Sequence, residues 1–322
     1  MKTMTTDASY VPPLYLRNPM LQTFLNSAGL RGCGRNSLRD AEQEIILELG
    51  EVRLQGFLSR RGQGAKGMVM LLHGWGGSAH SAYILRTGRY LFDAGYDVFR
   101  LNFRDHGNSH HLNKGFFIAD SLGELYDALK AVARLAGQSP LFLAGFSMGA
   151  NFAVRAAARY AADPIPVLKR ILAINPSVEA LAGIQRLDRI PLIKRYFLRK
   201  WKSTLARKQC LFPDLYDFSN IMRMQTAIEI GNALIERYLP YRSPEDYYGR
   251  FTLTQELFDA VQISLYIIMS EDDPLIPIQD LFSRTMNANT HLLVQRYGGH
   301  CGYITNLSMQ AWYLDKMLEI FV

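Results

Sequence analysis

The stretch PLFLAGFSMGANFAVRAAARYAA, residues 140–162, determines how the rest of the chain is interpreted. It begins with a short apolar run typical of a buried strand, passes through Gly145-Phe146-Ser147-Met148-Gly149, and continues as an alanine-rich amphipathic helix. A strand that turns into a helix around one exposed serine needs glycines beside it, because Cβ atoms there would leave no room. The G-x-S-x-G pattern in this setting predicts a nucleophile elbow, with Gly145 and Gly149 as the elbow glycines.

Short apolar strands alternate with amphipathic helices on both sides of this stretch. Strands are expected at 67–72, 96–103 and 170–175, and helices at 81–94 and 120–136. This alternation predicts an α/β fold with a mostly parallel central sheet and helices on both faces. Two β-type runs within 43–58, parted by Gly50, predict an antiparallel hairpin before it.

The alternation stops after Pro176 and resumes near Val261. The segment between them is helix-like, rich in aromatic and basic residues, and has no strong strand pattern. The pattern then returns with strands at 263–270 and 291–298 and a closing helix at 306–321. We therefore expect four parts: an N-terminal arm (1–42), a first core segment (43–176), an inserted helical cap (177–260) and a second core segment (261–322).

Composition indicates an ordinary globular protein. The 322 residues are 48% hydrophobic and 20% charged, with a formal net charge of +7, which favours anionic partners only mildly and does not imply nucleic-acid binding. The odd set of cysteines, Cys33, Cys210 and Cys301, has neither disulfide-framework nor zinc spacing. No signal peptide or apolar run of roughly 18 residues is present. These features predict a cytoplasmic protein that does not span a membrane.

A serine hydroxyl needs a general base, and the base needs a carboxylate that orients it. In sheets of this kind the chain order is nucleophile, acid, histidine. Asp273 follows the strand at 263–270, and His300 follows the next strand in the glycine-rich loop Gly298–Gly302. The sequence therefore predicts a catalytic triad of Ser147, Asp273 and His300.

The predicted reaction also needs two backbone N–H donors that stabilise an oxyanion. Met148, directly after the nucleophile, is expected to supply one. The turn His73-Gly74-Trp75-Gly76-Gly77 follows a strand and precedes a helix, and Trp75 is expected to supply the other.

Other assignments stay open for the acid and the base. Asp272 and Glu179 are alternatives for the acid, and His73 is an alternative for the base. His106, His110 and His111 are expected to stabilise the turn after the strand at 96–103. No metal-ligand spacing and no nucleotide-binding loop occur, so neither a metal nor a cofactor is expected.

At this point the sequence resembles the α/β-hydrolase superfamily and, within it, the YheT-like esterase branch. The narrower resemblance rests on PPLYLRNPMLQTFL at 12–25, the D-D-P run at 272–274, the G-G-H run at 298–300 and D-Y-Y at 246–248. The turn H-G-W-G-G-S departs from that branch, which tends to carry an acidic residue at the position of Gly76. The resemblance implies hydrolysis of carboxylic esters without a cofactor.

The hypothesis from sequence is an esterase or lipase that forms an acyl-enzyme on Ser147. Acyl transfer, amide hydrolysis and a non-catalytic binding role on the same scaffold are the alternatives. The expected partner is a small ester with an apolar acyl group. The basic stretch of the cap is expected to be a solvated helix face or a weak docking site for an anionic membrane; its residues are Lys194, Arg195, Arg199, Lys200, Lys202, Arg207 and Lys208.

Overall fold

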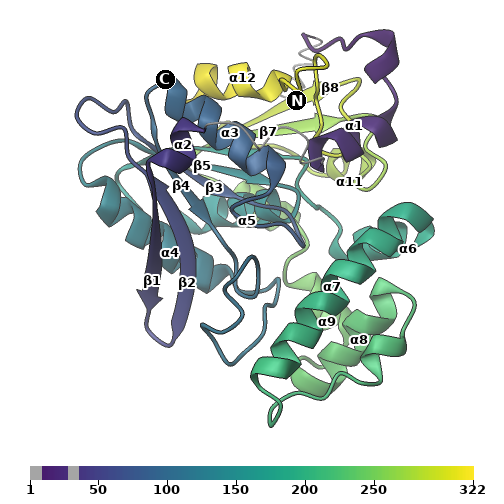
Figure 1. Cartoon of the computed structure of the whole chain (residues 1–322). Coiled ribbons are helices and arrows are strands. Elements are labelled where there is room, and N and C mark those ends of the chain that lie inside the picture. Colours follow the sequence, from purple (N-terminus) through teal and green to yellow (C-terminus); the bar gives the residue numbers. More distant parts are fainter. Residues whose placement is uncertain (1–8, 28–35) are drawn as a thin grey trace.

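The computed structural model describes residues 9–27 and 36–322. In this part of the chain one eight-stranded sheet runs in the order β1-β2-β4-β3-β5-β6-β7-β8 (Figure 1). The strands are β1 (Glu42–Leu49), β2 (Val52–Ser59), β3 (Met68–Leu72), β4 (Asp97–Leu101), β5 (Leu141–Phe146), β6 (Leu168–Ile174), β7 (Ser264–Ser270) and β8 (Thr290–Gln295).

The first two strands form the predicted antiparallel hairpin, and β2 also pairs antiparallel with β4. All other neighbouring strands are parallel, from β4 across to β8. The carboxyl ends of these strands therefore meet at one edge of the sheet. Such an edge is where sheets of this class place their ligands.

Helices cover both faces of the sheet, which confirms the predicted fold class. Side chains of β3 alternate: Met68 and Met70 pack in one apolar cluster with α4 (Leu122–Ala136) and α5 (Met148–Arg159). Val69 and Leu71 pack in a second cluster with α3 (Ala82–Asp93) and α12 (Trp312–Ile320). Alternation with a period of two residues is what a strand buried on both faces requires.

A helical segment is inserted between β6 and β7, and Figure 1 shows most of it as a green group standing beside the sheet. Helix α6 packs against α7, α8 and α9, whereas α10 returns to α5 in the core. The elements of this segment are α6 (Ala180–Arg189), α7 (Pro191–Leu211), η2 (Ile221–Arg223), α8 (Ala227–Tyr238), α9 (Pro244–Gly249) and α10 (Gln255–Asp259).

The remaining elements are short or differ from expectation. They are η1 (Leu14–Leu16), α1 (Pro19–Ser27), α2 (Ser37–Asp40) and α11 (Gln279–Phe282). The closing helix was predicted to begin at 306 but begins at Trp312, because Ile304 forms a β-bridge with Ala311 and Met309 has a φ of 62°. Cys210 and Cys301 are free thiols, and Cys33 lies outside the described residues.

Candidate active site

Ser147 is the single residue between β5 and α5, and its backbone is strained. Its φ of 54° and ψ of −115° are rare for a residue with a side chain. The flanking glycines allow this turn: a Cβ on Gly145 would lie 2.2 Å from the Gly149 carbonyl oxygen, and one on Gly149 would lie 2.6 Å from the His73 oxygen. The tight packing of strand against helix places Ser147, which is half-buried, at the carboxyl edge of the sheet.

The structure brings the three predicted triad residues into one hydrogen-bonded chain. His300 Nε2 lies 2.9 Å from Ser147 Oγ, and His300 Nδ1 lies 2.8 Å from Asp273 Oδ2. The Asp273 side chain is fully buried and that of His300 is 12% exposed. This order of contacts lets the imidazole accept the serine proton while the carboxylate fixes the ring.

The alternative acids face elsewhere. Asp272 accepts a hydrogen bond from the Gly299 N–H at 2.8 Å and so helps to fix the loop that carries His300. Glu179 pairs with Arg284 at 2.6 Å. Of the carboxylates proposed from sequence, only Asp273 contacts His300.

Asp273 is held by donors that the sequence did not reveal. Its Oδ1 accepts from the backbone N–H groups of Leu275 and Ile276 at 2.8 and 3.0 Å, and its Oδ2 accepts from Asn175 Nδ2 at 2.7 Å. Tyr303 in turn donates its hydroxyl to Asn175 Oδ1 at 2.6 Å. Asn175 directly follows β6, and its position at a strand end was the one signal that could have identified it.

The N-terminal arm anchors the His300 loop. Thr23 Oγ1 accepts from the His300 backbone N–H at 2.9 Å. The buried side chain of Gln22 accepts from the Ile304 N–H at 2.7 Å and donates to the Leu16 carbonyl oxygen at 2.7 Å. The arm therefore belongs to the site, a role that its composition did not predict.

The two predicted oxyanion donors remain available. Across residues 9–27 and 36–322, neither the Trp75 nor the Met148 backbone N–H donates to another protein group. The neighbouring Gly74 N–H donates to the Tyr83 hydroxyl at 2.8 Å, which holds this turn in place. A Cβ on Gly74 would lie 3.3 Å from the Ser147 Cβ, so the turn passes close to Ser147.

The other histidines near this edge are engaged in structural contacts. The buried His73 ring lies with Nδ1 2.8 Å from the Gly74 oxygen, and its Nε2 accepts from the Phe103 N–H at 3.3 Å. His106 Nδ1 donates to the Arg104 carbonyl oxygen at 2.8 Å, as expected of a turn-stabilising residue. Burial lowers the pKa of His73 well below its ordinary value and that of His106 to about 4. Neither ring is in contact with Ser147.

Two cavities meet at Ser147 and His300. The first, called here the acyl cavity, has a volume of about 160 Å³ and mostly apolar walls. Its walls include Phe197, Leu234, Ile235, Tyr248 and Phe251. The second, the outer cavity, has a volume of about 400 Å³ and is lined by Phe24, Gly76, Tyr83, Tyr196 and Lys200. The space beside Ser147 thus extends in two directions.

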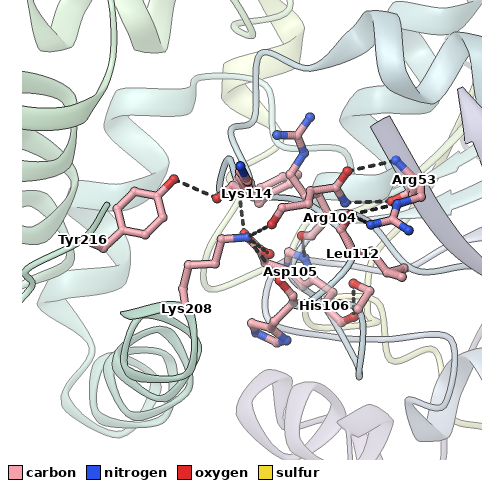
Figure 2. A network of polar contacts seen from close by, with 12 residues as sticks. Arg53, Arg104, Asp105, His106, Leu112, Lys114, Lys208 and Tyr216 are labelled. Atoms are coloured by element: carbon pink, nitrogen blue, oxygen red, sulfur yellow. Dashed lines mark hydrogen bonds and ion pairs between the residues drawn. The ribbon is translucent and has the colours of Figure 1, made fainter. Parts of the chain in front are cut away.

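The basic stretch of α7 is not one solvated face. Lys208 is fully buried and donates to Asp105 Oδ1 at 2.9 Å and to the Asn113 carbonyl oxygen at 2.6 Å (Figure 2). Lys200 donates to the Gly76 carbonyl oxygen at 2.8 Å, and Lys202 also donates to a backbone oxygen. Lys208 ties α7 to the loop after β4, Lys200 ties it to the turn after β3, and the Lys202 contact lies within the inserted segment. These contacts correct the expectation of a uniformly exposed basic helix.

The described residues contain neither a metal-binding group nor a membrane-spanning helix. No group of three or more His, Cys, Asp and Glu side chains there could hold a metal ion. Likewise, none of the helices in residues 9–27 and 36–322 is both long and apolar enough to cross a membrane.

Comparison with known proteins gives a consistent family and fold. Residues 63–300 match the model of a hydrolase family described as serine aminopeptidase, S33. The chain is 26% identical to slr0264 of Synechocystis sp., which carries an esterase name, over 92% of this chain and 88% of that protein. It is 21% identical to the phospholipase ABHD3 of Mus musculus, over 79% of this chain and 62% of that protein.

Among solved structures, the esterase Pf2001 of Pyrococcus furiosus has a similar fold. The TM-score is 0.57 at 18% identity, covering 89% of this chain and 92% of that chain. At this identity the likeness concerns the fold alone, an α/β-hydrolase fold.

Proposed function

Since the chain belongs to the α/β-hydrolase family described as serine aminopeptidase, S33, we propose that it hydrolyses carboxylic esters through an acyl-enzyme on Ser147. The observation that carries this proposal is the contact of His300 with both Ser147 Oγ, at 2.9 Å, and Asp273 Oδ2, at 2.8 Å. An esterase name on a relative aligned over most of both chains supports the choice of ester substrates.

In the first half of the proposed reaction, His300 Nε2 removes the hydroxyl proton of Ser147 as Oγ attacks the ester carbonyl carbon. The Trp75 and Met148 N–H groups donate hydrogen bonds to the resulting oxyanion. Each such donor lowers the activation free energy by about 2.7–4 kcal/mol. When the tetrahedral intermediate collapses, His300 returns the proton to the departing alcohol. Asp273 stays ionised and stabilises the imidazolium that forms in between.

In the second half, a water molecule takes the place of the alcohol. His300 accepts a proton from this water as its oxygen attacks the acyl carbon. His300 then returns the proton to Ser147 Oγ as the bond between Oγ and the acyl carbon breaks and the carboxylic acid leaves. The sum of the two halves is ester plus water giving acid plus alcohol, with no cofactor.

The cavities suggest which part of the ester lies where. The apolar walls of the acyl cavity suit a hydrocarbon acyl chain, because burial of apolar surface there is favourable. The outer cavity, which also reaches Ser147 and His300, suits the alcohol part and the entering water. In this proposal the inserted segment 177–260 acts as the predicted cap, since residues such as Phe197 and Leu234 wall the acyl cavity.

We keep the YheT-like branch as part of the proposal. Two of the short matches that suggested it, 12–25 and 298–300, contain residues that contact each other, because Thr23 accepts from the His300 N–H. Acyl transfer to another acceptor, amide hydrolysis and a binding role use the same groups and are the alternatives that the experiment separates.

The decisive experiment compares the native chain with Ser147→Ala on nitrophenyl esters of graded chain length and in labelling by a fluorophosphonate. We expect the variant to lose on the order of 10⁴–10⁶-fold in kcat and to remain unlabelled. Retained turnover would exclude Ser147 as nucleophile, and no labelling of the native chain would favour a binding protein. Product analysis with added alcohol, thiol or amine separates hydrolysis from acyl transfer.

A further inference from the structure

A third cavity, of about 420 Å³, lies between helix α7 and the loop that follows β4. We call it the basic cavity. It adjoins the outer cavity, since Gly76, Gly77 and Lys200 line both. The two cavities therefore border each other where Lys200 Nζ donates to the Gly76 carbonyl oxygen at 2.8 Å.

One face of α7 lines the basic cavity with polar and cationic side chains. They recur at helical spacing, so that successive turns present them to the same side. These residues are Arg199, Lys200, Ser203, Thr204, Arg207 and Lys208. Arg199 and Arg207 are exposed, Lys200 is half-buried, and Lys208 is buried.

Three of these cations lack a carboxylate partner. The charge of Lys208 is compensated by Asp105 at 2.9 Å. By contrast, Lys200 donates to the neutral Gly76 oxygen at 2.8 Å, and Arg207 donates to Asn108 Oδ1 at 3.2 Å. In the part of the chain that the structure describes, neither these two residues nor Arg199 forms an ion pair with Asp or Glu. The cavity therefore carries uncompensated positive charge.

A buried donor without a partner also lines this cavity. His110 is 4% exposed, and neither of its ring nitrogens has a hydrogen-bond partner. Burial, together with the nearby cations Arg207 and Lys208, lowers its pKa to about 4. The ring is therefore neutral near pH 7 and offers one N–H, which a buried site leaves unpaired only at a cost.

We propose that the basic cavity binds a phosphate group carried by the alcohol part of the substrate. Phosphate offers several acceptor oxygens and up to two negative charges, which suits two guanidinium groups, an ammonium group, hydroxyls and an imidazole N–H better than a carboxylate does. This inference rests on the proposed ester hydrolysis and names its substrate class as phosphorylated esters.

The experiment compares two substrates with the same acyl chain: octanoyl glycerol 3-phosphate and octanoyl glycerol. We expect the native chain to have a kcat/KM at least about tenfold higher for the phosphorylated ester. The double variant Arg199→Gln/Arg207→Gln should lose roughly that factor on the phosphorylated ester and stay within about twofold on the neutral one. Arg195→Gln, an exposed arginine of α7 outside the cavity, is the matched control and should change neither value.

Calorimetric titration with inorganic phosphate provides a readout that does not depend on catalysis. We expect binding by the native chain and by Ser147→Ala, weaker binding by the double variant, and a shift of the His110 ring resonances on saturation. Equal kcat/KM for the two esters, or an equal loss in Arg195→Gln, would overturn the substrate class. Phosphate binding without a substrate preference would assign the cavity to free phosphate instead.

These assays can reject either of the two proposals, ester hydrolysis and phosphate binding, without rejecting the other. Absence of turnover on every ester, nitrophenyl esters included, would count against ester hydrolysis. The phosphate titration would still show whether the basic cavity binds phosphate. Turnover of nitrophenyl and neutral esters without phosphate binding would count against the basic cavity alone.

Discussion

Asn175 Nδ2 lies 2.7 Å from Asp273 Oδ2, the same carboxylate oxygen that faces His300 Nδ1. Asn175 has a φ of 46° and its side chain is buried between the strand ends of β6 and β7. Its carboxamide is itself fixed by the Tyr303 hydroxyl. The carboxylate that orients the histidine is thus positioned by a side chain from a different strand.

Asn175→Ala should weaken this positioning without removing any reacting group. Loss of one buried hydrogen bond to a charged group costs about 1.5–3 kcal/mol, so we expect kcat to fall roughly tenfold to a hundredfold with KM little changed. Steady-state kinetics on a nitrophenyl ester measures this. Asn175→Asp should be worse, because it places a second carboxylate beside Asp273. Full activity in both variants would contradict the positioning role.

Thr23→Val should uncouple the N-terminal arm from the His300 loop. The valine has the same shape but cannot accept the His300 N–H hydrogen bond, so we expect a loss of about 1 kcal/mol in the free energy of unfolding and a several-fold lower kcat. Urea denaturation and ester kinetics are the measurements. Thr23→Ser keeps the acceptor and should restore most of the activity. If serine and valine behave alike, the hydrogen bond does not matter.

Gly145→Ala should destabilise the whole fold. The new Cβ would lie 2.2 Å from the Gly149 carbonyl oxygen, which is backbone and cannot move aside. We expect a cost of about 3 kcal/mol, measured by urea denaturation. Gly123→Ala on α4 is the control, because no atom lies within 4 Å of its Cβ, and it should stabilise by about 0.5–1 kcal/mol. Similar values for the two variants would show that the elbow tolerates side chains.

Lys208→Met should strongly destabilise the contact between α7 and the core. It leaves Asp105 buried without its counter-ion, a change that costs about 3–5 kcal/mol. The double variant Asp105→Asn/Lys208→Met removes both charges and should recover much of the loss; asparagine also tolerates the φ of 57° at residue 105. Urea denaturation of the four proteins gives the coupling energy. A coupling energy near zero would mean that the pair does not hold α7.

Stability should fall with acidification between pH 6.5 and about 4. Burial lowers the pKa values of His73 and His106 in the folded chain, whereas both rings take up protons at their ordinary pKa near 6.5 when unfolded. Their contribution is therefore complete above pH 6.5 and is lost as pH falls, by about 1.4 kcal/mol per pH unit for each ring.

Urea denaturation at pH 7.5, 6 and 5 tests this dependence. His106→Asn should have a shallower slope than the native chain, whatever its stability at pH 7.5. His291→Gln, a change at an exposed histidine, is the control and should keep the native slope. A native stability that is constant from pH 7.5 to 5 would refute the assignment of neutral buried rings.

The local signals of the chain were sufficient for the fold class, and they also predicted Ser147 and His300 as site residues. Alternating strands and helices fixed the parallel sheet, because each short apolar run can bury both faces only inside such a sheet. The two glycines around Ser147 and the glycine-rich loop around His300 are likewise consequences of tight turns. They were recognisable because steric demands at a turn act between residues close in sequence.

The tertiary structure decided which residues contact each other across long separations in sequence. Whether Asp272 or Asp273 faces His300 follows from how the loop after β7 is held by Leu275 and Ile276 N–H groups, and two adjacent aspartates look alike in sequence. The roles of Asn175 and Thr23 also depend on contacts with residues more than 90 positions away in the sequence. Hydrogen bonds and ion pairs of this kind leave no periodic or spacing pattern, since only folding brings their partners together.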